Sequence, residues 1–143
     1  MGKVRIITAE ESDFIRARDR QDRDRSRPNG PSDEEIDGTA IRYHHPGSNT
    51  TPQLFEVRVD PNVTVQAHAH GEDEIIAVIE GELRLGATVC RAGSSIFVEG
   101  RTLYGFTAGP EGARFLNFRP RADANYWTKT EFMMERARVA SGQ

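Results

Sequence analysis

Short runs in which apolar and polar residues alternate fill the middle of the chain, from residue 39 to residue 120. Residues 54–59 alternate and end at Asp60-Pro61, and residues 95–98 end at Glu99-Gly100. A period of two is typical of strands with one buried face, and Gly, Pro and Asp mark the turns between them. Many short strands at close spacing predict an all-β domain, built as an antiparallel sandwich or barrel.

The turn signals divide this region into nine expected strands. They cover residues 39–44, 54–59, 63–70, 74–79, 82–85, 88–91, 95–98, 103–107 and 114–118. Only Glu80-Gly81 separates the fourth run from the fifth, which predicts a tight hairpin at that point.

The two ends of the chain have other patterns. Within residues 1–38, nine of the twelve residues at 16–27 are Arg or Asp. Such mixed charge favours an arm that is partly flexible or that docks on a partner subunit. Within residues 121–143, Thr128 and Glu131 form a capping box, which predicts a short C-terminal helix.

The segment with the clearest chemistry is His68-Ala69-His70-Gly71-Glu72-Asp73-Glu74. Side chains alternate along a strand, so His68 and His70 point the same way, and Glu74 begins the next strand on its inward face. Two imidazoles and one carboxylate would bind a divalent transition metal and leave coordination positions open. We expect Fe(II) first, with Zn, Ni or Mn as alternatives. The other interpretation is a solvated acidic turn beside two surface histidines.

These residues resemble the first motif of the cupin superfamily, G-x5-H-x-H-x3-E-x6-G, with His68, His70, Glu74 and Gly81 at the family spacing. Asn62 stands at the position of the first Gly. The second motif begins at Gly93 and then departs from the family pattern, because Tyr104 stands where the last His ligand is usual. The resemblance covers residues 39–120. It implies an antiparallel double-stranded β-helix, or jelly-roll barrel, with a metal near one mouth.

Tyr104 has three interpretations. Its phenol ligates the metal as a phenolate, or it stays neutral and serves as a hydrogen-bond donor or general acid–base group, or it only packs inside the barrel. His44 or His45, before Pro46, is an alternative source of the missing fourth ligand.

Other residues are candidates for contact with a substrate. Gln66 shares parity with His68. Arg58 carries a charge in the middle of a strand, where it either binds a substrate carboxylate or faces solvent. Phe106 is expected to form an apolar cavity wall, and Asn117 to offer an amide. On the outer sheet face, Ile75, Ala77 and Ile79 form an apolar stripe that favours a homodimer.

Composition narrows the function classes. The 143 residues suit one domain, and 22 acidic against 19 basic residues give a net charge of −3. This balance gives no reason to expect nucleic acid or an anionic membrane as a partner. The single cysteine, Cys90, excludes an internal disulfide, and no apolar run approaches membrane-spanning length. We therefore expect a cytoplasmic protein.

Three functions agree with these features. The first is a non-haem iron oxygenase in which the metal binds a small polar organic substrate and O2. The second is an O2-independent isomerase, lyase or decarboxylase in which the metal acts as a Lewis acid and Tyr104 moves the proton. The third is a ligand-binding or regulatory cupin without catalysis.

Overall fold

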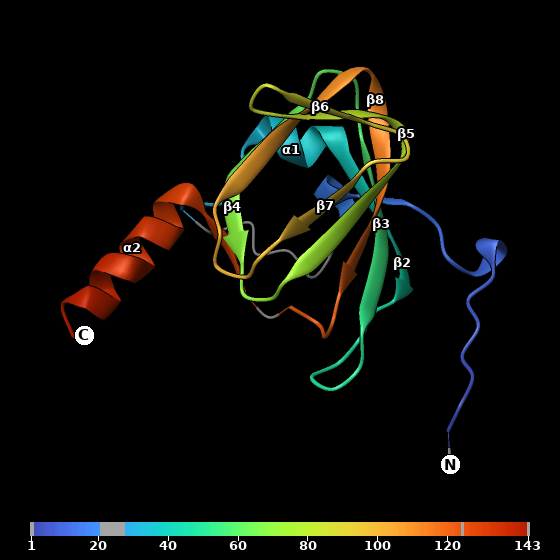
Figure 1. The fold of residues 1–143 in the computed structure, drawn as a ribbon, viewed down its shortest axis with the longest axis horizontal. Coiled ribbons are helices and arrows are strands. Elements are labelled where there is room, and N and C mark those ends of the chain that lie inside the picture. The colour runs from blue at the N-terminus through green and yellow to red at the C-terminus, as the bar shows by residue number, and fades with distance from the viewer. Residues whose placement is uncertain (1, 21–27, 124, 143) are drawn as a thin grey trace.

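The computed structural model describes residues 2–20, 28–123 and 125–142. Its strands pair only in antiparallel fashion and curl into a jelly-roll barrel, from which one helix projects (Figure 1). The predicted all-β fold and the short C-terminal helix are confirmed. Residues 21–27 of the charged stretch lie outside the described residues.

The strands of the described part are β1 (Ile15–Arg16), β2 (Thr39–His45), β3 (Gln53–Val59), β4 (Thr64–His70), β5 (Glu74–Leu85), β6 (Thr88–Arg91), β7 (Ser95–Val98), β8 (Tyr104–Arg119) and β9 (Tyr126–Thr128). Its helices are the 3₁₀ turns η1 (Ala9–Glu11) and η2 (Ala17–Asp19) and the α-helices α1 (Asp33–Gly38) and α2 (Lys129–Ala140). Strands β2, β3, β4, β6 and β7 agree with the sequence prediction to within about one residue.

Strands β5 and β8 are long, and they pair with each other along much of their length. The hairpin predicted at Glu80-Gly81 is wrong, because β5 continues through these residues and its pairing with β8 shifts register there. Gly81 has a φ of +68°, and a Cβ on it would collide with the carbonyl oxygen of Gly112. Glycine is therefore needed for the close approach of two backbones and not for a turn. In the same way, the two strands predicted at 103–107 and 114–118 are parts of β8.

The hydrophobic core lies inside the barrel. Its largest members include Val59, Ile76, Leu83, Phe106 and Phe115, all of them buried. Phe106 and Phe115 meet edge to face, with ring centroids 5.7 Å apart. Each such side chain contributes roughly 1.5–3 kcal/mol when it leaves water, so this cluster is the main force that closes the barrel.

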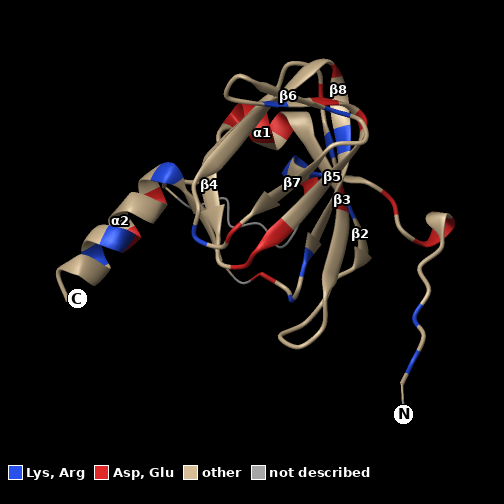
Figure 2. Cartoon of the chain, in the orientation of Figure 1, with Lys and Arg blue, Asp and Glu red and all other residues tan. Residues whose placement is uncertain are grey.

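Residues 12–20 lie along the outside of the barrel, and the described chain before them projects away from it (Figure 1). Strand β1 pairs with β2, and Arg16 binds the carboxylate of Asp60 at 2.9 Å. The ring of Phe14 lies under the guanidinium of Arg58, 4.1 Å from its carbon to the ring centroid. Helix α1 follows, with its acidic residues close together (Figure 2).

Helix α2 begins with the predicted capping box, in which Thr128 accepts a hydrogen bond from the Glu131 backbone and Glu131 accepts one from Thr128. Phe132 is buried against the barrel, and the centroid of its ring lies 5.8 Å from that of Trp127.

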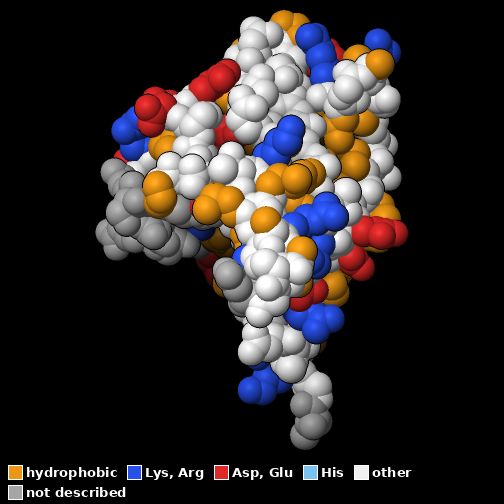
Figure 3. Space-filling model, turned by 90° about the vertical axis from the view of Figure 1, so that its left-hand side faces the viewer, with side chains coloured by type: hydrophobic (Ala, Val, Ile, Leu, Met, Phe, Trp, Pro, Cys, Tyr) orange, Lys and Arg blue, Asp and Glu red, His pale blue; other side chains and the backbone are white. Residues whose placement is uncertain are grey.

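Seen from the side on which α2 projects, hydrophobic side chains form small groups among Lys and Arg side chains (Figure 3). Among residues 2–20, 28–123 and 125–142, no helix has the length and apolar character needed to cross a membrane.

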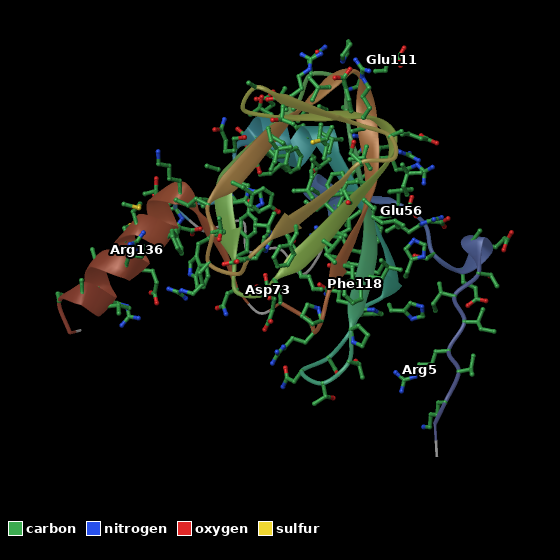
Figure 4. All side chains as sticks on the ribbon, viewed as in Figure 1. Arg5, Glu56, Asp73, Glu111, Phe118 and Arg136 are labelled. Atoms are coloured by element: carbon green, nitrogen blue, oxygen red, sulfur yellow. The ribbon has the colours of Figure 1, made fainter. Side chains whose placement is uncertain are left out.

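An apolar row crosses the outer face of the sheet. Phe97 of β7, Ile75 of β5 and Phe118 of β8 are direct neighbours in the strand pairing, with 62%, 44% and 40% of each residue exposed. Figure 4 labels Phe118. Of the predicted outward stripe on β5, Ala77 and Ile79 are half-buried. The exposed apolar surface therefore runs across three strands and not along β5.

A buried ion-pair network fastens three strands on the outer face. Glu56 of β3 is 2% exposed and accepts hydrogen bonds from Arg42 of β2 at 2.5 Å and Arg114 of β8 at 2.6 Å (Figure 4). His44 Nε2 lies 2.8 Å from the same carboxylate. Burial alone would raise the pKa of Glu56, but its hydrogen bonds from Arg114, His44 and Arg42 outweigh burial and hold the pKa at about 2, below the ordinary 4.5.

We predict that Glu56→Gln lowers the free energy of unfolding by roughly 3 kcal/mol at pH 7, because the lowered pKa represents stabilisation of the ionised form. This stabilisation is present above pH 4.5 and is lost as the pH falls towards 2, so at pH 3 the difference from the wild type should be less than half as large. Urea unfolding at both pH values measures it. Glu80→Gln is the matched control, since Glu80 also binds Arg114 but is exposed. An equal loss in both variants, or a loss that does not change with pH, would contradict the prediction.

Candidate active site

A cavity of about 470 Å³ lies in the barrel, between the strands and helix α1. Its aromatic and apolar lining includes Tyr43, Phe55, Val57, Val65, Phe106, Phe115 and Tyr126. Its polar lining includes Arg20, Glu35, His68, His70, Tyr104, Asn117, Arg119 and Asp123. An apolar pocket in which a few polar groups converge is typical of a small-molecule site.

Strand β4 places His68 and His70 side by side on the cavity wall, with ring centroids 5.1 Å apart. The Nδ1 atom of His68 lies 2.8 Å from the Gln66 carbonyl oxygen, and that of His70 lies 2.8 Å from Asp123 Oδ2. An oxygen acceptor at Nδ1 fixes the proton there and leaves the lone pair on Nε2. Burial and the neighbouring His70 lower the pKa of His68 to about 4, so its ring is neutral at pH 7.

Glu74, at the start of β5, is only 1% exposed and has hydrogen-bond donors on both carboxylate oxygens. Oε1 accepts a hydrogen bond from the Tyr104 hydroxyl, and Oε2 accepts one from Asn117 Nδ2 at 3.1 Å. Arg119 adds two more to Oε2, from Nε at 3.1 Å and from Nη2 at 3.0 Å. Burial alone would raise the pKa of Glu74, but its cationic and hydrogen-bonding neighbours outweigh burial and lower it. The carboxylate is therefore ionised and fully paired.

Arg119 connects the carboxylate to the histidines. It is 7% exposed, its Nη1 donates to Gln53 Oε1 at 3.1 Å, and its guanidinium lies 5.0 Å above the Phe55 ring. Its Nη2 lies 3.3 Å from each ring nitrogen of His70. One buried cation thus contacts two of the three predicted metal ligands.

Tyr104 lines the cavity and donates its hydroxyl proton to Glu74. Burial and the negative charge of Glu74 raise the pKa of the phenol well above 10. Of the three interpretations from the sequence, the arrangement of these side chains agrees with the neutral hydrogen-bond donor.

Two of the predicted substrate contacts lie away from the cavity. Gln66 is exposed, because β4 shifts its register between Val65 and His68, so that Val65 lines the cavity with His68. Arg58 is exposed on the outer face and packs on Phe14. The predictions for Gln66 and Arg58 are therefore wrong in this structure.

Of the other candidates, two line the cavity and two do not. Phe106 and Asn117 both line the cavity, and Asn117 also binds Glu74. His44 contacts Glu56 on the outer face and does not line the cavity, and neither does His45, which pairs with Leu54.

Sequence reasoning missed three residues of the site: Arg119, Asp123 and Tyr126. Arg119 follows Asn117 by two residues and lies on the same face of β8, so strand parity with the candidate Asn117 could have identified it. Asp123 meets His70 from 53 positions away, and Tyr126 stacks on His68 at 5.2 Å from β9. No local pattern in the sequence signals these two long-range contacts.

Two residues other than glycine have a left-handed backbone conformation in the described part of the chain. Asn62 and Arg101 both have φ near +61°, in the left-handed region that favours Gly. Arg101 donates its backbone N–H to the His70 carbonyl at 2.7 Å, and its guanidinium lies 5.0 Å from the Trp127 ring. The loop before Tyr104 is therefore fastened to β4 beside the histidines.

The sequence predicts that His68, His70 and Glu74 bind a divalent metal. As the side chains stand, the described part of the chain contains no group of three His, Cys, Asp or Glu positioned to hold an ion. The two imidazoles nevertheless have the hydrogen bonds that are usual at metal-binding histidines. In each ring Nδ1 lies within hydrogen-bond distance of an oxygen atom, which leaves the lone pair on Nε2. His68 and His70 therefore offer two nitrogen donors, and Glu74 would join them only if it exchanged some of its present partners.

Comparisons with known proteins found structural neighbours. No family model matches the chain, and no curated protein matches it in sequence. The chain is similar to the polyketide cyclase RemF from Streptomyces resistomycificus, with a TM-score of 0.56 and 26% identity over 64% of this chain and 71% of RemF.

Two further neighbours share the fold. A deletion mutant of the oxalate decarboxylase OxdC from Bacillus subtilis has a TM-score of 0.58 and 18% identity over 73% of this chain and 32% of the enzyme, so the match spans about a third of that protein. An RmlC-like cupin from Shewanella frigidimarina has a TM-score of 0.51 and 21% identity, over 66% of this chain and 86% of that cupin. The chain therefore shares the cupin fold of these neighbours.

Proposed function

We propose that the chain is a cupin enzyme that moves a proton on a small, polar, carbonyl-bearing molecule in the barrel cavity, in a reaction that consumes no O2. Isomerisation, elimination and cyclisation belong to this class. The observation that carries the proposal is the hydrogen bond from Tyr104 to the buried Glu74 at the cavity. The similarity to RemF, a polyketide cyclase, supports the same class of reaction.

Tyr104 is the residue that holds the proton. Its raised pKa keeps the hydroxyl protonated at neutral pH, and Glu74 fixes its position. The phenol has a single proton, so Tyr104 donates to a substrate oxygen only when its O–H turns from Glu74 to that oxygen. The new hydrogen bond strengthens as the oxygen gains negative charge during the reaction. Tyr104 is then the general acid, and Glu74 holds its hydroxyl in place before the substrate binds.

The cavity walls favour a flat molecule with oxygen substituents. Phe55, Phe106 and Tyr126 offer aromatic surface that excludes water, and Arg119 offers a cation for a polar or anionic group. A volume of about 470 Å³ suits an organic molecule of one to a few rings.

A divalent transition metal would be held by His68 and His70, with Glu74 as a third ligand, and would supply a Lewis acid that polarises a substrate carbonyl. The Fe(II) oxygenase expected from the sequence uses the same ligands. The paired phenol and carboxylate favour proton transfer over oxygenation, because they provide a protonated acid at the substrate-facing surface.

Tyr104→Phe should lower turnover by about 10²- to 10⁴-fold, since it removes the proton donor but keeps the ring. Its unfolding free energy should change by only about 1 kcal/mol, the scale of one hydrogen bond. The assay compares wild type and variant on a diketone, a catechol and a polyketone, in air and without oxygen.

Tyr43→Phe is the control, because Tyr43 also lines the cavity but has no contact with Glu74 among the described residues. We expect wild-type turnover to persist without oxygen. A reaction that stops without oxygen would replace the proposal with the oxygenase, and a fully active Tyr104→Phe would return Tyr104 to a packing role.

His70→Ala should weaken binding of Zn²⁺ by at least about tenfold, because it removes one of two prepared imidazole ligands. Isothermal titration calorimetry of the purified protein measures this. His44→Ala is the control, since His44 lies on the outer face beside Glu56. Equal affinity in wild type and His70→Ala would remove His70 from the metal site.

We also propose that the chain forms a homodimer through the apolar row of Phe97, Ile75 and Phe118, which is supported by the exposure of three adjacent apolar side chains. Light scattering after gel filtration should give twice the 16.0 kDa chain mass for the wild type. Phe97→Glu should shift it to the monomer, and Val89→Glu, at an exposed site on β6, should not. A monomeric wild type, or a dimeric Phe97→Glu, would refute this interface.

A further inference from the structure

One nitrogen of Arg119 contacts both His70 and Glu74. Nη2 lies 3.0 Å from Glu74 Oε2 and 3.3 Å from each ring nitrogen of His70. Because Nη2 is equally far from both ring nitrogens, it lies over the His70 ring and not along the lone pair of Nε2. The guanidinium therefore occupies a lone pair of the Glu74 carboxylate and covers the face of the His70 imidazole at the same time.

A metal ion bound by His70 and Glu74 needs the same carboxylate lone pair and the space beside the imidazole. Zn²⁺ binds imidazole nitrogen and carboxylate oxygen at about 2.0–2.2 Å, so an ion on His70 and Glu74 would lie closer to both than Nη2 does now. The guanidinium is a cation whose nitrogens are donors without a free lone pair, so it cannot coordinate the ion and repels it. The second oxygen of Glu74 is already bound to Tyr104.

Arg119 is anchored but has space on one side. Gln53 and Phe55 hold the guanidinium, and the residue also lines the cavity. Its two hydrogen bonds to Glu74 balance the charge of a carboxylate that is 1% exposed. Whatever displaces Arg119 must supply positive charge in its place, as a divalent metal does.

We propose that Arg119 is an internal competitor of the metal ion. Without metal it occupies His70 and Glu74. When a divalent ion binds these ligands, the guanidinium leaves Glu74 and turns to the cavity, where it pairs with an anionic group of the substrate. This inference rests on the metal-binding part of the proposed function. It assigns Arg119 a role opposite to that of a supporting residue, which would orient Glu74 and strengthen metal binding.

The sign of one measured change distinguishes these roles. Zn²⁺ affinity is measured by competition with a chromophoric chelator for wild type, Arg119→Gln and Arg119→Lys, with thermal unfolding to confirm that each variant is folded. Competition predicts that Arg119→Gln binds Zn²⁺ at least about tenfold more tightly than wild type, and that the charge-retaining Arg119→Lys stays within about threefold of wild type. Arg121→Gln is the matched control, because Arg121 is exposed and pairs with Glu72.

Weaker or unchanged binding in Arg119→Gln overturns the inference but leaves the proposed function standing, since the site would still bind metal. No Zn²⁺ binding by any of the proteins overturns both the inference and the metal-binding part of the proposed function.

A second measurement needs no variant. The Nε–H of Arg119 donates to Glu74, so its signal in a ¹⁵N NMR spectrum of the wild type reports this contact directly. Addition of Zn²⁺ should move this signal and speed its exchange with water, while other arginine signals keep their positions. An Arg119 signal that does not respond to bound Zn²⁺ contradicts the competition.

Discussion

A carboxylate buried inside a β-barrel must be paired, because an unpaired one costs several kcal/mol or gives up its charge. Glu74 meets this constraint with three partners, Tyr104, Asn117 and Arg119, all from strand β8. Tyr104 and Arg119 are the two ends of that strand, which has 16 residues. A straight strand of this length would hold its ends about 50 Å apart, so the site exists only because β8 curls around the barrel.

Charge balance then explains the rest of the site. Arg119 neutralises Glu74, and Asp123 fixes the proton of His70 on Nδ1. His68 is neutral because burial and its neighbour lower its pKa. The same centre can therefore be balanced by a guanidinium or by a metal ion, and the exchange of one for the other changes which side chains face the cavity.

Local patterns predicted much of the fold and part of the site. Alternation identified β3, β4 and β7 because it reflects one buried face of each strand, and the spacing of His68, His70 and Glu74 brought these residues into one region. The prediction that Gln66 lines the cavity was wrong because β4 shifts its register between Val65 and His68, and residues two apart no longer share a face across such a shift. Asp123 and Tyr126 were missed because they reach the histidines through the tertiary fold alone. Gly81 correctly indicated an unusual backbone conformation. The sequence pattern indicated a hairpin turn there, whereas in the structure Gly81 allows the close approach of β5 and β8.

The account depends on Glu74 being the point at which one cation replaces another. The most direct measurement is a crystal structure of the wild-type protein saturated with Zn²⁺. The account predicts an ion bound to His68 and His70, with Glu74 as a ligand and Arg119 turned from it into the cavity. A saturated crystal in which Arg119 still binds both His70 and Glu74, with no ion on the histidines, would contradict it.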